Sequence, residues 1–521
     1  MDEGPSGGGL AQCGVVALIH TIMAIELTLD RIRVLASYLK PYTRPTCHVA
    51  GTNGKGSVTA LLSSILRSSS PPLSVGRFNS PHLVSVHDCI AINNKPVAPN
   101  IYTKARRAVE QADRDYNVGA SSFELLTLTA LLVFEEAELD IVVIEVGMGG
   151  RLDATNVISD ECILVSALTA VDLDHQAFLG HTIEAIAREK AGIARSGKPF
   201  ILGKQTHHNV TVAVQQTVQD EMLIHAQVPA KREWDVALDN PKPRQISFLS
   251  SDLQVCLSQP VEVKLLPAFS KPILATLPLH GEHQLENLGT TASMISALLT
   301  HPSCTKMLPH IATRITPETV ARGIQTTRWP GRLSFHTVAV PETKAIQHSR
   351  SLTVLADGAH NPASSATLGK FIMSLLDLCT PQSDAPPVTI SLTYILALSH
   401  SPPKKPSDTL APLFSPSILS HASNVRVKMN VALIEFTPPE GMPWVKSVPP
   451  SELRQVVLDA APGVPTWEPG NGISVDKHLS DALAWAAARH EQDVGQNGEG
   501  LVVLAGSLYL VADLYRFMNV Q

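Results

Sequence analysis

The residues best suited to chemistry form a glycine-rich string between an expected strand and an expected helix: Gly51, Thr52, Asn53, Gly54, Lys55, Gly56 and Ser57. Glycines let backbone N–H groups converge on an anion, and a helix N-terminus adds a positive field, so this placement predicts a phosphate-binding loop. The Lys55 amine would reach the β- and γ-phosphates of a nucleotide, and the Ser57 hydroxyl would face Mg²⁺. A bare Gly-Lys-Gly is a turn in most proteins; the strand before it, the helix after it and the hydroxyl of Ser57 favour phosphate binding here.

Acidic residues follow two further apolar runs. Glu145 ends the run 141–144, and Asp172-Leu173-Asp174-His175 follows the run 162–168. Open α/β sheets bind ligands at the carboxyl ends of their strands, which makes Glu145 a candidate magnesium ligand. The alternative for Glu145 is a solvated carboxylate at a strand end. His175 is a candidate metal ligand too, although an exposed loop histidine is the plainer interpretation.

Three more positions have both a structural and a chemical interpretation. Lys190, in Arg188-Glu189-Lys190-Ala191-Gly192, has the pattern of an exposed helix lysine. Turn chemistry alone accounts for Asp357-Gly358-Ala359-His360-Asn361-Pro362. Arg332 falls at an expected domain junction, where an arginine is structural or stabilises a transferring phosphate.

The elements that must position these residues follow an α/β rhythm. Residues 46–50, 141–144 and 162–168 predict buried strands, and the spacing of apolar residues predicts helices over 58–66 and 284–299. Between about 205 and 280 a β-type alternation replaces this rhythm. A second α/β set begins near 330, with strands expected at Leu352–Ala356, Val388–Leu398, Val431–Phe436 and Leu501–Ala505. The Pro- and Ser-rich stretch 401–425 predicts a surface loop inserted into that set.

Length and composition restrict the fold and the partners. A chain of 521 residues exceeds what one core usually serves, so two or three domains are expected. A net charge of −6 argues against nucleic-acid binding driven by phosphate neutralisation. The seven cysteines contain no Cys-x-x-Cys pair, which argues against a zinc cluster or a disulfide framework.

The N-terminal 22 residues are expected to be an appendage outside the fold. The apolar run 13–25 is too short to span a bilayer, and Asp2 and Glu3 precede it instead of a basic start. No arginine occurs before Arg31, which disfavours a mitochondrial presequence. We therefore expect a cytoplasmic protein without membrane association, with a mitochondrial pool as the alternative.

In their order along the chain, these strings resemble the folylpolyglutamate synthase and dihydrofolate synthase family of the Mur ligase superfamily. The matching strings are His48–Ser57, Ser80–Leu83, Ser122–Glu124, Glu145–Asn156, Asp174–His175, Arg188–Gly192, Trp329–Arg332 and Asp357–Pro362. The resemblance covers about 25–521. It implies a P-loop-containing, Mur-ligase-like ATPase domain over 23–328, followed by a smaller Rossmann-like α/β domain over 329–521.

The resemblance also implies roles. ATP would be bound by Thr52, Asn53, Gly54, Lys55, Gly56, Ser57, Asn287, Arg332 and Asp357. Catalysis would involve Lys55, Lys190 and His360, and magnesium would be held by Ser80, Glu145 and His175. Lys190 matches a lysine that the family carbamylates, which would provide a second metal site. The pterin-bearing substrate would lie near Leu29, Asp30, Arg31, Ser122, Phe123, Leu152, Asp153 and Ala154.

The implied reaction is ATP- and Mg²⁺-dependent ligation of L-glutamate to a carboxylate through an acyl phosphate, by an enzyme expected to be a monomer. The segments Met23–Ile32 and Glu440–Trp444 resemble monofunctional fungal-type dihydrofolate synthases, which use dihydropteroate. Folylpolyglutamate synthase, which extends a reduced folate, or a bifunctional enzyme is the alternative. Ser399–Pro406 departs from the Asp-Lys-Asp-like string of relatives. A P-loop switch or kinase and a non-catalytic remnant fit the strings less well.

Overall fold

The fold is known from a computed structural model. It describes residues 27–235, 238–239, 245–250, 253–340, 350–379, 387–401, 404–415, 418, 425–442, 445–495 and 498–518. The expected appendage 1–22, the first four residues of Met23–Ile32, and Pro443 and Trp444 lie outside these residues.

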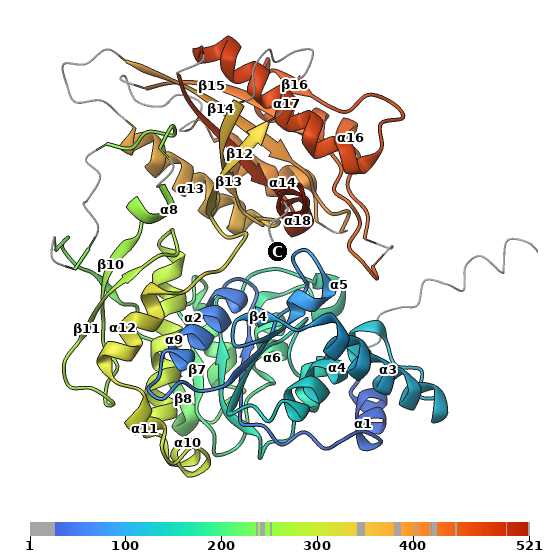
Figure 1. The fold of residues 1–521 in the computed structure, drawn as a ribbon, viewed down its shortest axis with the longest axis vertical. Helices are drawn as coiled ribbons and strands as arrows, with labels where there is room; N and C mark the ends of the chain where they lie inside the picture. The colour runs from blue at the N-terminus through green and yellow to red at the C-terminus, as the bar shows by residue number, and fades with distance from the viewer. Residues whose placement is uncertain are drawn as a thin grey trace, which may run out of the picture.

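The described residues form two stacked α/β bodies, with the first two-thirds of the chain below and the last third above (Figure 1). The lower body contains an eight-stranded sheet of order β4-β3-β2-β5-β1-β6-β7-β8. Its strands are β1 (Thr46–Ala50), β2 (Val75–Phe78), β3 (Ile90–Ile92), β4 (Lys95–Pro96), β5 (Ile141–Glu145), β6 (Ile163–Leu168), β7 (Phe200–Leu202) and β8 (Leu223–His225). Strands β2 and β5 to β8 run parallel to β1 or to its neighbours, and the edge strands β3 and β4 are antiparallel.

The central strand β5 shows why its sequence is a continuous apolar run. Successive side chains of a strand point to opposite faces. Ile141 and Val143 enter one hydrophobic cluster, and Val142 and Ile144 enter another on the opposite face. Both faces are covered, so no polar alternation is needed, as in parallel sheets generally. Glu145 is then the first polar residue, at the carboxyl edge of the sheet.

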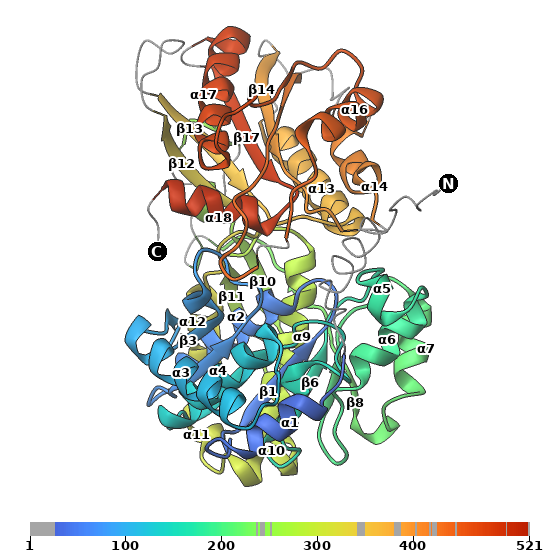
Figure 2. The same cartoon turned by 90° about the vertical axis from the view of Figure 1, so that its right-hand side faces the viewer.

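Helices cover both faces of this sheet (Figures 1 and 2). One face packs on α2 (Lys55–Arg67), α9 (His283–Thr300), α10 (Pro302–Met307), α11 (Ile311–Arg314) and α12 (Pro317–Gln325). The other packs on α1 (Asp30–Ser37), α3 (Pro99–Asp115), α4 (Ser122–Glu136), α5 (Gln176–Leu179), α6 (Ile183–Ala191) and α7 (His208–Gln215). Short turns η2 (Val86–Cys89), η3 (Ala154–Val157) and η4 (Asp220–Met222) join them. The expected helices 58–66 and 284–299 are confirmed within α2 and α9.

A small antiparallel sheet occupies the region where the βα rhythm was expected to loosen. Its order is β11-β10-β9, formed by β9 (Ala230–Lys231), β10 (Gln259–Val263) and β11 (Ile273–Leu277). Before β10, helix α8 (Leu253–Cys256) and the residues around Phe248 leave this sheet and join the core of the upper body. Ser247 Oγ donates to the Glu499 carboxylate at 2.6 Å, and this hydrogen bond ties the segment around Phe248 to the upper sheet.

The upper body is built on a six-stranded sheet of order β12-β13-β17-β14-β15-β16. Its strands are β12 (Ser334–Val340), β13 (Arg350–Ala356), β14 (Val388–Leu396), β15 (Val425–Leu433), β16 (Thr466–Trp467) and β17 (Glu499–Ala505). Helices α13 (Pro362–Leu378), α14 (Pro406–Leu410) and α16 (Pro450–Ala460) cover one face, and α17 (Val475–Val494) and α18 (Leu508–Phe517) the other. The α/β prediction is confirmed for both bodies. The strand expected at 431–436 is shifted, since β15 ends at Leu433.

The prediction of a surface loop over 401–425 is wrong for its central part. Residues 406–414 form α14 and the short turn η5 (Ala411–Phe414), and Leu410, Leu413 and Phe414 are buried in the upper core. The ring of Phe414 packs edge-on against Tyr394 with centroids 5.7 Å apart. Prolines and serines set the turns here, while the few apolar residues between them anchor the segment.

No helix in the described part of the chain has the length and apolar character needed to cross a bilayer.

We predict that Phe414→Ala lowers the free energy of unfolding by about 3–5 kcal/mol, because it removes a buried ring from a packed core. Chemical denaturation followed by circular dichroism would measure this. The matched control is Ser407→Ala in the exposed part of α14, which should change stability by no more than about 0.5 kcal/mol. Equal, small effects would show that the segment does not anchor the upper body.

Candidate active site

The glycine-rich string is the turn between β1 and α2, as predicted. Gly54 caps α2 with φ of +94°. A Cβ atom on Gly54 would lie 2.2 Å from Asn287 Oδ1. Only glycine fits both this backbone conformation and this contact. Asn287 on α9 is thus held against the phosphate-binding loop.

Helix α9 presents a polar edge to the loop. Asn287 Nδ2 donates to Gln284 Oε1 at 2.9 Å, and Gln284 Nε2 donates to Ser57 Oγ at 3.2 Å. All three side chains are buried. The chain of hydrogen bonds fixes the Ser57 hydroxyl at the first turn of α2, where the helix field favours an anion. Gln284 was not among the residues predicted from the sequence.

Two lysine amines converge on one carbonyl oxygen. Lys55 Nζ donates to Gly51 O at 3.0 Å, and Lys190 Nζ donates to the same oxygen at 3.0 Å. Lys190 is only 2% exposed, so the interpretation of an exposed helix lysine is wrong. Burial, reinforced by the charge of Lys55, lowers the pKa of Lys190 to about 7. The amine therefore exists in both protonation states near neutral pH.

Glu145 faces the same region. Its side chain is buried, so the solvated-carboxylate alternative is wrong. Oε2 accepts from Asn79 Nδ2 at 2.6 Å, and Oε1 lies 3.8 Å from Lys55 Nζ. Burial raises the pKa of Glu145, while Lys55 and Asn79 oppose that rise. Ser80 follows Asn79 directly, and Asn79 could have been found from its place just after β2.

His175 lies in the loop after β6, at the same edge of the sheet as Glu145. Its Nε2 is 3.6 Å from Asp174 Oδ2. Its side chain is 45% exposed, as the exposed-loop interpretation expected, and partial desolvation, with Lys190 and Lys55 nearby, lowers the pKa of His175 despite the Asp174 carboxylate. The imidazole is therefore neutral at physiological pH, which is the form that binds metal ions.

The donors fit a divalent cation that also binds phosphate oxygens. Within the described residues, no three His, Cys, Asp or Glu side chains are grouped closely enough to hold a metal by themselves. Mg²⁺ is usually bound through one or two carboxylates, supplemented by other protein groups, substrate phosphates and water. A buried carboxylate at Glu145, a hydroxyl at Ser80 and a neutral imidazole at His175 match that pattern.

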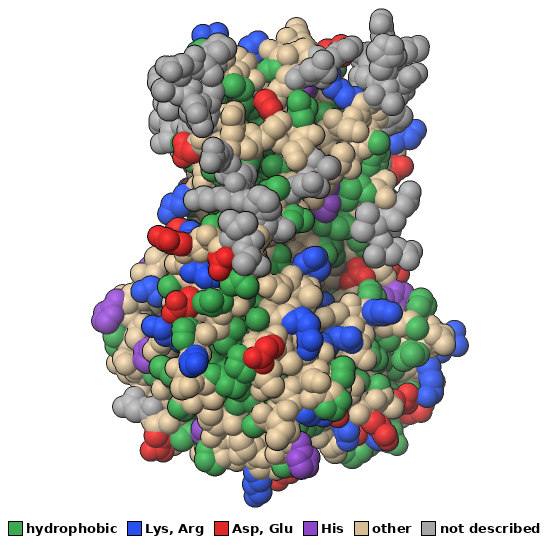
Figure 3. Space-filling model, turned by 60° about the vertical axis from the view of Figure 1, so that its left-hand side comes forward, with side chains coloured by type: hydrophobic (Ala, Val, Ile, Leu, Met, Phe, Trp, Pro, Cys, Tyr) green, Lys and Arg blue, Asp and Glu red, His purple; other side chains and the backbone are tan. Residues whose placement is uncertain are grey.

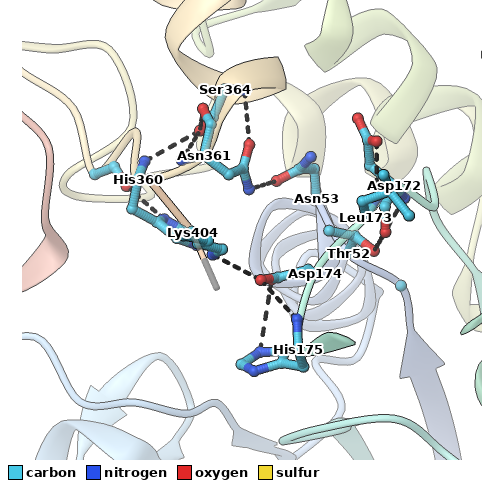
Figure 4. A network of polar contacts seen from close by, with 12 residues as sticks. Thr52, Asn53, Asp172, Leu173, Asp174, His175, His360, Asn361, Ser364 and Lys404 are labelled. Carbon is cyan, nitrogen blue, oxygen red and sulfur yellow. Dashed lines mark hydrogen bonds and ion pairs between the residues drawn. The ribbon is translucent and has the colours of Figure 1, made fainter. Parts of the chain in front are cut away.

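The upper body supplies a second set of polar groups (Figure 4). Asn361 Nδ2 donates to Asn53 Oδ1 of the phosphate-binding loop at 3.3 Å. His360 Nδ1 lies 2.9 Å from Gly358 O, so the Gly358 carbonyl orients its ring. Asp357 accepts from Leu333 N at 2.8 Å, and burial raises the pKa of Asp357 against the influence of Arg332.

A cavity of about 760 Å³ lies at the junction of the two bodies, large enough for a drug-sized ligand. Its lining includes Trp329, Arg332 and Phe335. The guanidinium of Arg77 stacks over the Trp329 ring at 5.0 Å. A Cβ on Gly56 would come within 2.5 Å of that ring, so the phosphate-binding loop and the junction are in direct contact. Arg77 was not predicted as a site residue. Figure 3 shows charged side chains around the junction of the two bodies.

The residues predicted to hold a pterin meet at one end of the lower body. Leu29, Phe123 and Ala154 belong to one hydrophobic cluster. Arg31 Nε donates to the Glu124 carboxylate at 3.3 Å, which ties α1 to the start of α4. Asp30 and Ser122 are the first residues of those helices, and Leu152 is half-buried in the loop before η3.

Asp153 is fixed by a buried hydrogen-bond chain that the sequence did not reveal. Its Oδ2 accepts from Met148 N at 2.8 Å, and its Oδ1 accepts from Thr155 Oγ1 at 2.5 Å. Thr155 Oγ1 in turn lies 2.8 Å from His48 Nε2. Burial lowers the pKa of His48 to about 3, so this histidine is neutral. Because the Thr155 hydroxyl already donates its hydrogen bond to Asp153, it can only accept from His48. The Nε2–H group of His48 is therefore the donor to Thr155 Oγ1.

The comparison with known proteins decides the family. A model described as "Mur ligase middle domain" matches residues 49–297, and one described as "Dihydrofolate synthetase, C-terminal domain" matches residues 342–517. The chain is 31% identical over 503 residues to dihydrofolate synthetase of Saccharomyces cerevisiae, covering 95% of this chain and 99% of that one. The chain belongs to the dihydrofolate synthetase family. It is an ATP-dependent ligase.

Other members are similar over their whole length. The probable dihydrofolate synthetase of Schizosaccharomyces pombe is 28% identical over 502 residues, covering 96% of this chain and all of that one. Folylpolyglutamate synthase of Mycobacterium tuberculosis, solved with ADP and AMPPCP, shares the fold with a TM-score of 0.68 at 23% identity, covering 95% of this chain and 96% of that one. The family resemblance read from the motifs is confirmed.

We predict that Glu145→Gln lowers activity on the order of 10²-fold or more, because it removes a negative charge where a metal ion and a transferring phosphate would be stabilised. Steady-state ADP release at saturating Mg²⁺ measures this. Glutamine has the same size as glutamate, and its side-chain oxygen can still accept from Asn79. The midpoint of thermal unfolding should therefore stay close to that of the wild type. Near-normal turnover in the folded variant would remove Glu145 from the metal site.

Carbamylation of Lys190 stays a prediction. Its buried amine, with a pKa of about 7, has a neutral fraction able to attack CO₂, giving a carbamate and releasing a proton. We expect Lys190→Ala to lose activity and short carboxylates such as acetate to restore part of it. Native mass spectrometry of the wild type under CO₂ should show a 44 Da adduct, a mass that is about the molecular weight of CO₂ itself. An active alanine variant without any adduct in the wild type would contradict the idea.

Proposed function

We propose that this ligase joins L-glutamate to 7,8-dihydropteroate, using ATP and Mg²⁺ and releasing ADP and phosphate. The observation that supports it most directly is the convergence of Lys55, Lys190 and Glu145 at the edge of the sheet, with His360 of the upper body close to Asp174 in the loop after β6. Such an arrangement would suit a triphosphate bound between the two bodies. Near full-length similarity to fungal dihydrofolate synthetases supports the choice of substrate.

The site provides what an acyl-phosphate mechanism needs. A carboxylate does not react with an amine at neutral pH because it lacks a good leaving group. Transfer of the γ-phosphoryl group to the substrate carboxylate supplies one, and the glutamate amine then displaces phosphate to form the amide. Lys55 at the phosphate-binding loop and Arg332 at the junction would offset the negative charge that moves during the transfer.

The remaining residues position and shield the reactants. Bound Mg²⁺ would supply charge neutralisation at the β- and γ-phosphates, and Glu145, Ser80 and His175 are proposed to hold it. Asn287 and Asp357 are proposed to contact ATP, and His360 to face the transferring group from the upper body. Contact between the two bodies would keep water away from the acyl phosphate.

The pterin is proposed to lie between α1, the start of α4 and η3. Phe123 offers an aromatic face, and the buried hydrogen bonds of Asp153 fix the loop before η3 that would lie against the pterin. A pterin held there places its attached carboxylate at a distance set by the length of the substrate. We further propose that the enzyme acts as a cytoplasmic monomer.

Substrate choice is tested by supplying each carboxylate separately. We expect glutamate- and Mg²⁺-dependent ADP release with 7,8-dihydropteroate, and little with tetrahydrofolate monoglutamate, whose reacting carboxylate is aliphatic and farther from the pterin. Coupled ADP release together with mass analysis of the pterin product measures both. Comparable rates would make the enzyme bifunctional, and turnover of tetrahydrofolate alone would reassign it to polyglutamylation.

A further inference from the structure

An ion pair crosses from the upper body to the lower one beside the site (Figure 4). Lys404 Nζ lies 2.7 Å from Asp174 Oδ1. Asp174 follows β6 and directly precedes His175, a proposed metal ligand. The contact therefore joins the segment before α14 to the loop that carries part of the metal site.

Buried residues that follow Lys404 fix its position in the upper body. Lys404 lies two residues before α14, whose residue Leu410 is fully buried, and Phe414 follows in η5 against Tyr394. The inserted segment thus directs a lysine at the lower body, on a support that the segment itself builds.

Asp174 has few other ways to satisfy its charge. The residue is only 6% exposed, and its Oδ1 also accepts the His175 backbone N–H at 3.0 Å. Breaking a largely buried ion pair on one side leaves a costly unpaired charge. The charged and titratable groups that face Asp174 are Lys404, His175, His360 and Lys190. Lys404 is the one among them that makes a direct ion pair from the upper body.

The neighbouring contact between the bodies is weaker. Asn361 and Asn53 share a neutral hydrogen bond of 3.3 Å. The charge-assisted contact of 2.7 Å between Lys404 and Asp174 holds its groups together more strongly than the neutral hydrogen bond of 3.3 Å between the two asparagines. The ion pair is therefore the better candidate for keeping the upper body against the loop after β6.

We propose that Lys404 is a positioning residue that holds the upper body closed on the Asp174–His175 loop while the acyl phosphate exists. The proposal rests on the acyl-phosphate function proposed above. Loss of the contact lets water reach the intermediate. Water then attacks in place of the glutamate amine, so the products are the free substrate carboxylate and phosphate, and ATP is consumed without amide formation.

The experiment compares ADP released with amide product formed. In Lys404→Ala we expect the ratio of ADP to ligated product to rise well above the wild-type ratio, and kcat/KM for ligation to fall about tenfold or more. Lys404→Arg should restore much of the coupling, since it keeps the charge. Lys405→Ala is the matched control, because Lys405 is exposed at the start of α14 and should leave the ratio unchanged.

A second measurement needs no variant. Salt screens partly exposed ion pairs, so raising the salt concentration should raise the ADP-to-product ratio of the wild type and affect Lys404→Ala less. An unchanged ratio in folded Lys404→Ala, whether or not its rate falls, would overturn the proposal. The ratio is measured with whichever pterin carboxylate the wild type ligates. If the wild type ligates none, the proposed function fails, independently of Lys404.

Discussion

The structure of the site depends on how two ammonium groups are kept close together. Lys55 and Lys190 both donate to the carbonyl oxygen of Gly51, and the second of these lysines is buried. Two like charges at such a distance repel one another strongly in a desolvated site. The repulsion is relieved by a lower pKa at Lys190, by the Glu145 carboxylate and by any anion that enters the cleft. The loop is therefore prepared for a polyphosphate before one binds.

The parallel sheet makes this convergence possible. Strands β1, β5 and β6 lie side by side, so the turns that follow them open on the same edge. The phosphate-binding loop, Glu145 and the Asp174–His175 loop are thus neighbours, although they are far apart along the chain. These strands must be apolar throughout, because helices cover both faces of the sheet. Polar groups can therefore lie only at the edge where the strands end.

The upper body completes the site from the opposite side. The residues proposed to face the phosphates come from the turn between β13 and α13, and the inserted segment before α14 adds Lys404. The excursion around Phe248 and α8 packs the lower chain onto the upper core, so the two bodies are joined by more than the single connection at Arg332. The polar contacts near the site then act between parts that are already held near one another.

The sequence by itself determined the α/β fold, the phosphate-binding loop and the position of Glu145, because these depend on local patterns: apolar runs, helical spacing and motifs at strand ends. Lys190 and Asp357 were assigned to the site only by the family resemblance. The sequence did not determine burial. Lys190 has the pattern of an exposed lysine, and only packing of α6 under the loop after β1 places its amine on Gly51.

Tertiary structure alone also decided which distant residues support the site. Asn79 holds Glu145 across 66 residues, and His48 supports Thr155 across 107. The segment 401–425 looked like a loop because prolines and serines dominate it, yet a few apolar side chains bury it and direct Lys404 at Asp174. Such contacts join residues that share no period and no motif, so their energies arise only when the chain has folded.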